Sequence, residues 1–480
     1  MRPTILDIFR RAGAAITAFN STAPSPGTTR GYEGAASGRR WFGTKSMPNP
    51  RAEQIGARAT LANRARGLVA NNPFAASGVD AWVSALVASG IRPQATYPDD
   101  GVRATLNASF EEWTDRADAD ELGDFYALQA LAVRRVVTDG ESFMVLINDP
   151  AGLRIRLLDP EQIDPSIHRE LPGGGRVVAG IEFAADGRRV AYHVLPERQG
   201  VAFNYPATAV RIPADDVIHL FRVDMPGQVR GVSWLAPILL RLADYDAAID
   251  AQLVRQKVAT LVAGFITSTP QDGLLSGDQN TGEFDSTMEP GALIRLPPGT
   301  SVTFSDPAKI GAEVIDFLKV TAREIAAGLG VPYEAMTGDL TSVNYSSIRA
   351  GMVAWRRRVE TIQHNTIAFQ MLRPIWQRWA TIEILSGRIV GEVAPALGAR
   401  WITPKQEWVD PSKDVEAEVA AIAAGLTSRR QMVAARGIDI EALDAEIAAD
   451  RARETSLNLS FGAAAAPKPK GAADAANPDT

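Results

Sequence analysis

The sequence predicts an α+β protein in which helices flank a mixed or antiparallel sheet and a separate pair of helices carries a small tip. Three observations predict this class. Strand-type alternation is concentrated between residues 140 and 221, and long stretches of helical periodicity lie on both sides of it. A Gly-, Pro- and Ser-rich stretch is enclosed between two of the helical stretches. With 480 residues, the chain is long enough for several packed units.

The first part of the chain predicts an arm followed by the sheet-containing domain. Residues 1–54 are rich in Gly, Ser, Thr, Ala and Pro without a sustained period, so we expect a mobile arm. Helical patterns then run over 55–89, with a break at Asn71 to Pro73, and over 120–137. Strand patterns follow to Phe221, among them a hairpin over 180–194 in which Asp186 and Gly187 form the turn. Residues 55–230 are therefore expected to be one α+β domain.

A pair of long helices encloses the next stretch. Ser233 is expected to cap a helix that reaches residue 262, and a second helix covers 313–329 and stops at Gly330. Between them, 264–307 is rich in Gly, Pro, Ser and Asp with short strand-like pieces. Because one helix leads into this segment and the other leads out, it is predicted to be a tip on a two-helix stalk. The apolar face of the second helix is Val314, Phe317, Thr321, Ile325 and Leu329.

A polar connection over 331–345 leads into a second long helical pattern. Its apolar positions include Trp355, Val359 and Phe369. Pro374 removes a backbone donor and crowds the carbonyl of Gln370, so we expect a kink there. Short helices follow within 412–455, and the spacing of Ser428 and Gln431 predicts a capping box. Residues 457–480 are expected to be a disordered tail.

The composition narrows the classes of function. The chain has no cysteine, which excludes disulfides and thiolate metal sites. The formal net charge of −6 argues against binding nucleic acid with the whole surface. The longest apolar run, 258–266, is about half of the ~20 residues that a membrane span requires, so we expect a protein inside a cell without membrane contact. We expect no metal or other cofactor, because four histidines show no ligand spacing: His168, His193, His219 and His364.

No catalytic motif stands out, and an enzyme is disfavoured. Phosphate-binding glycine loops, nucleophile elbows and zinc motifs are absent from the sequence. Asp139 and Glu141 form a carboxylate pair with acid–base potential, but a turn between helix and strand explains them better. Ser346 and Ser347 stand where a helix begins, and capping explains them better than nucleophilic attack. A hydrolase using Ser346 or the acids at 139–141 remains an alternative.

Several passages resemble the lambda family of phage portal proteins. They extend in the family's order across roughly residues 55–455, and the two tails fall outside the resemblance. The longest are IPADDVIHLF (212–221), PGQVRGVSWLAPI (226–238), GVPYE (330–334) and NYSSIRA (344–350). AsnAsnPro before the WVSALV helix and the hairpin with GIEF and YHV also agree.

The resemblance implies a portal-type fold assembled as a ring, usually of twelve copies. It implies an α/β wing, a two-helix stem, a small β-containing clip, a long kinked helix and a helical crown. Applied to this chain, the plan is an arm (1–54), the wing (55–230), the first stem helix (231–262), the clip (263–310), the second stem helix (311–330), a channel loop (331–345), the kinked helix returning to the wing (346–408), the crown (409–456) and the tail (457–480).

The resemblance also implies function and partners. A portal ring is the channel at one capsid vertex through which the terminase packages DNA, which is later ejected. The implied partners are other copies of the chain, double-stranded DNA passing without sequence readout, the terminase large subunit, head-completion or adaptor proteins, and major capsid and scaffold proteins. The implied location is the virion, with the host cytoplasm during assembly, for an active phage or a prophage.

Candidate site residues follow from this plan. A net acidic wall lets DNA slide, because few cations contact its phosphates. The hypothesis is that short polar groups of the channel loop face the DNA: Thr337, Asp339, Thr341, Ser342 and Asn344. An intersubunit or DNA-facing basic cluster is expected at Arg356, Arg357 and Arg358, and clip contacts at Arg295 and Lys309. A head or connector assembly protein without a DNA channel remains the other alternative.

Overall fold

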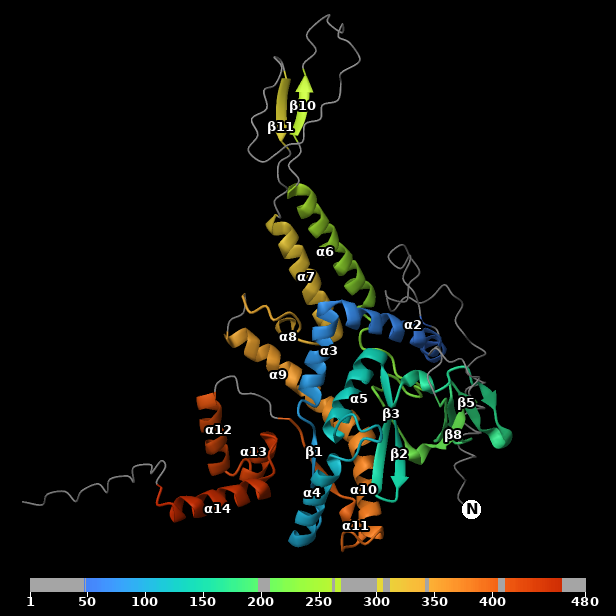
Figure 1. Ribbon diagram of the computed structural model, residues 1–480, viewed down its shortest axis with the longest axis vertical. Helices are drawn as coiled ribbons and strands as arrows, with labels where there is room; N and C mark the ends of the chain where they lie inside the picture. Colours follow the sequence, from blue (N-terminus) through green and yellow to red (C-terminus); the bar gives the residue numbers. More distant parts are fainter. Residues whose placement is uncertain are drawn as a thin grey trace, which may run out of the picture. The chain divides into compact units, whose positions relative to one another are not determined.

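The computed structural model describes Met47 and residues 49–196, 208–260, 264–268, 300–304, 311–341, 345–404 and 411–459 (Figure 1). The chain divides into two compact units, Met1–Glu53 and Gln54–Thr480. In the first unit, the described residues are Met47 and 49–53, where helix α2 begins. The rest of the predicted arm and most of the predicted tail therefore lie outside the described residues.

Four helices and a break between two of them precede the sheets. The break predicted at Asn71 to Pro73 is confirmed: the Asn72 Oδ1 accepts hydrogen bonds from the backbone N–H groups of Phe74 and Ala75, both at 3.0 Å, and Pro73 opens the next helix. The third helix is one that the sequence analysis missed. The four helices are α2 (Pro50–Asn71), α3 (Pro73–Leu86), α4 (Asp100–Thr114) and α5 (Phe125–Asp139).

Two antiparallel sheets follow, as the strand patterns predict. The first has the order β3-β2-β9, from β2 (Glu141–Asp149), β3 (Gly152–Leu158) and β9 (Val217–Phe221). The second has the order β4-β5-β6-β7-β8, from β4 (Arg169–Glu170), β5 (Arg176–Val178), β6 (Ile181–Phe183), β7 (Arg189–Val194) and β8 (Val210–Pro213). The predicted AspGly hairpin is confirmed as β6 and β7, with Gly187 at φ 85° in the turn.

Strand β2 divides the apolar residues between two cores. Met144 and Leu146 face the larger core, which also contains residues of α3, α4, α5 and α10. Phe143 faces a smaller core together with Ile181 and Tyr192 of the second sheet. Because successive strand residues point to opposite faces, one strand joins both cores.

Two helices and two strands form the region that the sequence predicts as a stalk and tip. They are α6 (Leu239–Thr260), β10 (Gly264–Ser268), β11 (Thr300–Phe304) and α7 (Ala312–Leu329). Strands β10 and β11 pair antiparallel, and α6 and α7 lie side by side (Figure 1). Helix α6 starts six residues after the predicted cap Ser233, because the intervening residues make tight turns, such as that from the Ala236 N–H to the Ser233 carbonyl at 3.0 Å.

The second long helical pattern contains a π-helix where the sequence predicts a kink. Helix α8 (Tyr333–Thr337) precedes α9 (Tyr345–Ile362), the π-helical segment Gln363–Leu372 and α10 (Arg373–Leu385). The break is therefore spread over ten residues and is not confined to Gln370. Pro374 stands in the first turn of α10, where its missing N–H costs least.

The π-helix also changes which residues face the core. Phe369, predicted on the apolar face, is 57% exposed, with the Arg373 guanidinium 5.2 Å from its ring centre. The prediction was wrong because the i to i+5 spacing shifts side chains around the helix axis. Gln363 and Gln370 fix the segment: the Gln363 amide donates to the Leu86 carbonyl at 2.9 Å, and the Gln370 Oε1 accepts from the Phe221 N–H at 3.0 Å.

The remaining elements are short. Helix α11 (Val393–Ala396) leads to β12 (Ala399–Ile402), which pairs antiparallel with β1 (Arg92–Ala95). Helices α12 (Pro411–Ala423), α13 (Arg429–Ala435) and α14 (Ile440–Ser456) follow. The predicted capping box of Ser428 and Gln431 is confirmed. Among the described side chains of these three helices, Val433 is the buried apolar one, and partly exposed ion pairs join the helices to one another.

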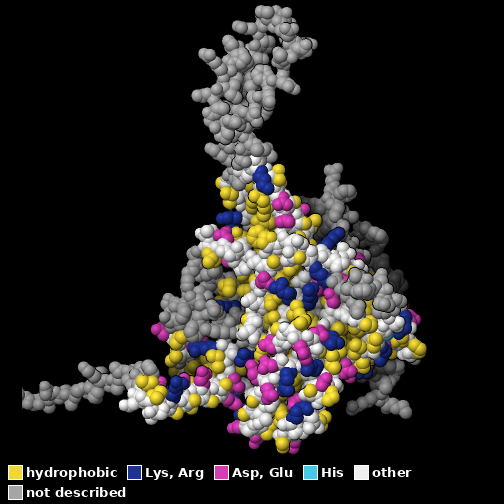
Figure 2. All heavy atoms as spheres, viewed as in Figure 1, with side chains coloured by type: hydrophobic (Ala, Val, Ile, Leu, Met, Phe, Trp, Pro, Cys, Tyr) yellow, Lys and Arg dark blue, Asp and Glu magenta, His cyan; other side chains and the backbone are white. Residues whose placement is uncertain are grey.

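Several large apolar side chains are left exposed on α6 and α7, and Figure 2 shows hydrophobic side chains gathered over this helix pair. Phe317, predicted on the apolar face of α7, is 63% exposed. The packing of α7 within the chain therefore leaves this ring largely uncovered. No helix in the described part of the chain is long and apolar enough to cross a membrane.

Candidate functional site

The connection from α7 to α9 is anchored where α7 ends. Gly330 adopts φ 82°, and its N–H donates to the carbonyls of Ala326 and Ala327, as a left-handed helix cap requires. Arg358 on α9 donates from Nη1 to the Gly330 carbonyl at 2.8 Å, and the Trp82 indole of α3 donates to the Leu329 carbonyl at 3.1 Å. Two other helices therefore fix the residue from which the connection starts.

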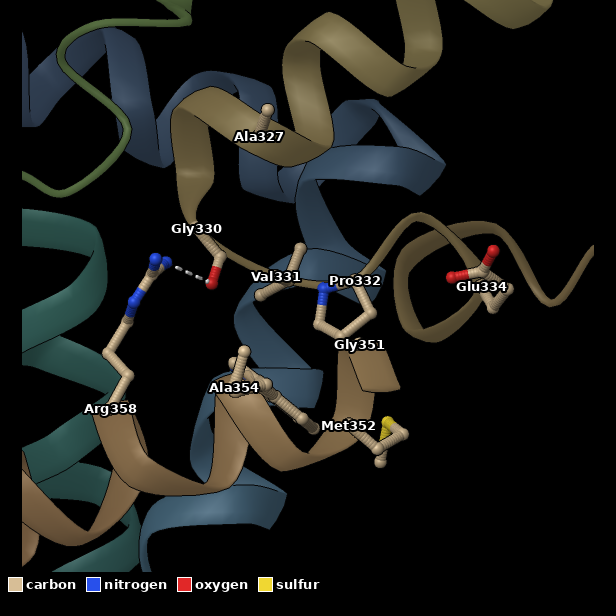
Figure 3. Close-up of a pocket in the computed structure, with 10 residues that line it drawn as sticks. Ala327, Gly330, Val331, Pro332, Glu334, Gly351, Met352, Ala354 and Arg358 are labelled. Carbon is tan, nitrogen blue, oxygen red and sulfur yellow. Dashed lines mark hydrogen bonds between the residues drawn. The ribbon is translucent and has the colours of Figure 1, made fainter. Parts of the chain in front are cut away.

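A hollow of about 430 Å³ lies beside this anchor (Figure 3). The end of α7, helix α8 and the outward side of α9 form its walls. Figure 3 shows Arg358 of α9 pointing toward Gly330 at one end of the hollow, and Glu334 of α8 at the other. Trp355 also lines it, and the Trp355 Nε1 is buried without an acceptor among the described residues. The lining residues are Ala327, Gly330, Val331, Pro332, Glu334, Gly351, Met352, Ala354, Trp355 and Arg358.

Asp339 organises the described part of the connection. Its carboxylate accepts hydrogen bonds from the Thr341 hydroxyl at 2.6 Å, the Thr341 N–H at 3.0 Å and the Tyr333 hydroxyl at 3.0 Å. The Lys319 Nζ of α7 lies 3.9 Å from it. The donors on Thr341, then Tyr333 and the charge of Lys319, lower the pKa of Asp339 to about 2. The carboxylate is thus ionised and holds the connection to α7.

The structure uses three of the five candidate loop residues within the connection itself. Thr337 donates from its hydroxyl to the Tyr333 carbonyl at 2.8 Å and accepts from the Asp339 N–H at 3.2 Å. Thr341 is bound to Asp339, as described above. Ser342 and Asn344 lie outside the described residues. The sequence analysis missed Leu340, which is 63% exposed between these polar groups; its position inside a polar run gave no signal of an exposed apolar side chain.

The three consecutive arginines of α9 differ in their surroundings. Consecutive helical residues point about 100° apart, so the three guanidinium groups diverge. Arg358 is bound to Gly330, Arg357 is exposed and Arg356 is half-buried. The candidate clip residues Arg295 and Lys309 lie outside the described residues.

The carboxylates at 139 and 141 lie in a buried ionic cluster. Glu141 is fully buried and contacts three cationic or polar donors: Arg230 Nη2 at 2.7 Å, Arg58 Nη1 at 3.0 Å and His219 Nε2 at 3.0 Å. Burial by itself raises the pKa of Glu141, but the Arg230 charge, the His219 hydrogen bond and the Arg58 charge hold it well below its usual range. Glu141 is therefore a fixed anion.

The neighbouring Asp139 and His219 are also held by contacts within the protein. Asp139 accepts from Arg66 Nε at 2.6 Å and from Arg135 Nη1 at 3.0 Å, and burial raises its pKa. The His219 ring stacks between Phe143 and Phe221, with ring centres 4.2 and 4.3 Å apart, and burial lowers its pKa to about 4. Carboxylates held between guanidinium groups have no position for a substrate, so the structure gives no support to acid–base chemistry at 139–141.

The cluster determines how the chain passes from the sheets to α6. The Gly231 N–H donates to Glu141 at 2.8 Å, and the Trp234 N–H donates to the Val137 carbonyl at 3.0 Å. A Cβ on Gly140, which adopts φ 96°, would lie 2.2 Å from the Val232 carbonyl carbon. The backbones are therefore in direct contact. The sequence analysis missed the roles of Arg58, His219 and Arg230, because their partners are 78 to 89 positions away along the chain.

A second ionic contact joins α14 to α4. Glu441 accepts from Arg103 Nη2 at 2.9 Å and from Arg430 Nη2 at 3.2 Å. The Asp439 carboxylate, which caps α14, accepts from the Gln94 amide at 2.7 Å. A hollow of about 560 Å³ lies beside these contacts, lined by Asp439 and Glu441 together with apolar side chains such as Ile402 and Ile438.

The side chains of Ser346 and Ser347 lie outside those that the structure describes, so the serine alternative gains no support. Among the described residues, no group of three His, Asp or Glu side chains is placed to hold a metal ion. The described residues of this mixed helix and sheet fold thus show buried ionic clusters, a polar connection held by its own hydrogen bonds, and exposed apolar helix surfaces.

The chain belongs to the lambda family of phage portal proteins. The model of the family described as "Phage portal protein, lambda family" matches residues 36–363. The probable portal protein of Halomonas phage phiHAP-1 is 26% identical over 444 residues, which cover 89% of this chain and 83% of that protein. Portal protein B of Escherichia phage lambda is 25% identical, with coverage of 88% of this chain and 89% of that protein.

Two solved structures resemble the fold more distantly. The neck of a native gene transfer agent particle, computed with C12 symmetry, gives a TM-score of 0.47 at 17% identity, covering 80% of this chain and 93% of that chain. An HK97-family phage portal protein from Corynebacterium diphtheriae gives a TM-score of 0.31 at 10% identity, covering 73% and 95%. Both scores are below 0.5, so these likenesses carry no weight for assembly.

Proposed function

We propose that copies of the chain form a closed ring at one vertex of a phage capsid, and that double-stranded DNA is packaged and later ejected through its centre. The observation that carries the proposal is the family match over residues 36–363, which includes α6, α7, α8 and the connection into α9. The relatives of the family cover most of this chain's length and bear the name portal protein.

In this proposal, the connection 331–345 lines the channel. Its Asp339 is bound by Thr341 and Tyr333 and balanced by Lys319 of α7, whereas Glu334 adds a second negative charge. The described part of the loop has no cation of its own and is net negative. Weak attraction for phosphates suits a wall along which DNA slides, because every fixed cation adds to salt-dependent binding. The polar groups contact DNA without reading its bases, since contacts to phosphate and water carry no sequence information.

The remaining parts take the roles that the family plan gives them. Helices α6 and α7 are the stem, and 263–310 is the clip that meets the terminase and head-completion proteins, with Arg295 and Lys309 as candidate contacts. Residues 55–230 are the wing and 409–456 the crown facing the capsid interior and its scaffold. The protein assembles in the host cytoplasm and ends in the virion.

Deletion of residues 338–343 tests this function in a phage that carries the chain as its portal. We expect rings to form and heads to fill poorly, as counted by electron microscopy of DNA-filled particles. Replacing the same six positions by Gly and Ser is the matched control, which separates loop length from side-chain chemistry. Normally filled heads with intact rings after the deletion would contradict the role of the loop.

A further inference from the structure

The helix pair α6/α7 carries two exposed apolar surfaces. On α6, Leu240 and Val254 are 74% and 57% exposed, and Ala243, Ala247 and Ala251 are exposed on the same side. These five residues recur at steps of three or four, so they share one face of the helix. The face that packs inward carries Leu242 and Tyr245 instead, at 0% and 7% exposure. We name the exposed face, Leu240 to Val254, the alanine flank.

The second surface lies on α7 and is built from larger side chains. Phe317 and Val320 are 63% and 61% exposed and stand three residues apart. The inward face of α7 carries Ala322, Ile325 and Leu329, at 3%, 1% and 4% exposure. We name the exposed pair of Phe317 and Val320 the phenylalanine flank. The middle of the alanine flank is thus a shallow row of methyl groups between Leu240 and Val254, and the phenylalanine flank projects a ring and a branched side chain.

Charged residues border both flanks, among them Asp244 and Asp250 on α6 and Glu313, Asp316 and Arg323 on α7. Asp244 and Arg323 have opposite signs, and neither makes an ion pair in the described part of the chain. Asp244 lies beside the alanine flank, three residues before Ala247, and makes no ion pair among the described residues. Arg323 lies beside the phenylalanine flank, three residues after Val320. Its guanidinium lies over the Tyr333 ring at 5.4 Å, and it has no carboxylate partner among the described residues. The two flanks therefore differ in relief, and Asp244 and Arg323 offer one pair of opposite charges.

The heights of the two flanks along the helix pair also match. The ion pair of Arg241 and Glu324, at 3.3 Å, fixes the two helices relative to one another. Since α6 and α7 run in opposite directions at the same rise per residue, Phe317 lies level with residue 248, next to Ala247. Arg323 lies level with residue 242, about 3 Å along the helix axis from Asp244. A rotation about an axis along the helix pair leaves these heights unchanged, so it brings level residues of two copies together.

We propose that the phenylalanine flank of one copy packs on the alanine flank of the next, and that Arg323 pairs with Asp244 across this contact. The inference rests on the proposed ring and identifies the surfaces that close it. Two different flanks on one chain require a head-to-tail contact, which closes into a ring when the rotation between copies allows it. A contact of the phenylalanine flank with itself leaves the alanine flank exposed and brings two Arg323 side chains together.

Cysteine cross-linking tests the contact, because the chain has no cysteine of its own. Chains with Ala247→Cys are mixed with chains that carry Val320→Cys, and mild oxidation is expected to give covalent dimers. A chain with both substitutions is expected to give a ladder that ends at the closed ring. Ala247 lies on the side of α6 opposite the buried Leu242 and Tyr245, so a bridge to Val320 of the same chain is not expected. Leu122→Cys, at a residue that is 90% exposed, replaces Val320→Cys as the control and is expected to give no dimer with Ala247→Cys.

A charge exchange tests the ion pair separately. Asp244→Arg and Arg323→Asp are each expected to reduce the ring fraction severalfold, and the double variant is expected to restore it, as counted in electron micrographs. Rings that form without cross-links between positions 247 and 320 would overturn this contact and leave the proposed ring standing. Failure of the unaltered chain to form rings would overturn both. Rings unaffected by either single exchange, or not restored by the double exchange, would refute the Arg323–Asp244 pair.

Discussion

Replacing Glu141 by glutamine removes the negative charge from a site that holds two buried guanidinium groups. The side chains of Arg58 and Arg230 are 3% and 2% exposed, and both donate to this carboxylate. The neutral amide leaves two cations inside the protein without their counter-charge. Because removing one partner of a buried ion pair costs about 3 to 5 kcal/mol, we expect the free energy of unfolding of Glu141→Gln to fall by that amount.

Glu182→Gln is the matched control, because donors of the same types surround its carboxylate. Arg211 donates to it from Nε and Nη2, both at 2.9 Å, and the His193 Nε2 lies at 3.3 Å. The Arg211 side chain is 51% exposed, so water solvates its charge when the carboxylate is lost. We expect this substitution to cost about 1 kcal/mol or less.

Urea unfolding followed by tryptophan fluorescence compares the two variants with the unaltered chain at pH 7. The expected order of stability is unaltered chain, Glu182→Gln, then Glu141→Gln well below both. Equal losses for the two variants would refute the reasoning that burial determines the strength of these clusters. A loss below about 1 kcal/mol for Glu141→Gln would refute it as well.

Three further predictions concern titration and ionic contacts. His219 has a pKa of about 4 in the fold against 6.5 for an exposed histidine, so the unfolded chain binds more protons than the folded chain between these pH values. The free energy of unfolding therefore falls as the pH drops from 6.5 to about 4. His219→Gln is expected to remove on the order of 3 kcal/mol of this pH dependence, as measured by urea unfolding between pH 4 and 7. Asp339→Asn weakens the bonds to Thr341, so amide exchange at Thr341 is expected to become severalfold faster, as hydrogen-exchange mass spectrometry would show. Glu441→Gln removes the ion pair with Arg103, so limited proteolysis ahead of α12 is expected to become faster. In the unaltered chain, 1 M salt is also expected to make this proteolysis faster, because it shortens the Debye length to about 3 Å and so weakens the ion pair.

Each of these predictions has an outcome that would contradict it. An unchanged pH slope in His219→Gln would mean that another group titrates in the window. Unchanged exchange at Thr341 would mean that Asp339 does not hold the loop. Proteolysis that is insensitive both to Glu441→Gln and to salt would mean that helices α12, α13 and α14 are held against α4 by packing and not by the ionic contact with Arg103.

Local patterns in the sequence predicted local structure well. The break at Asn72, the hairpin at Gly187, the stop of α7 at Gly330 and the capping box at Ser428 are all present, because each depends on residues within a few positions of one another. Helix α4 was missed. The π-helix at Gln363 was foreseen only as a kink at Gln370, since Pro374 indicates a break in the helix without indicating how the chain accommodates it.

The contacts of the candidate site were harder to predict from the sequence. The polar residues of the loop were found by composition, but the binding of Asp339 to Lys319 depends on contact with a preceding helix. The cluster around Glu141 could not be foreseen, because Arg58 and Arg230 come to it from distant parts of the chain. The exposure of Phe317 could not be foreseen either, because an apolar side chain on the surface of a helix can have the same sequence pattern as one that faces the core.

Electron microscopy of the purified, unaltered chain tests the central claim most directly. The proposed function predicts closed rings with a central hole, in which every copy presents the connection 331–345 to that hole. Monomers, open chains or rings without a passage through the centre, at concentrations and salt close to those of a cell, would contradict it.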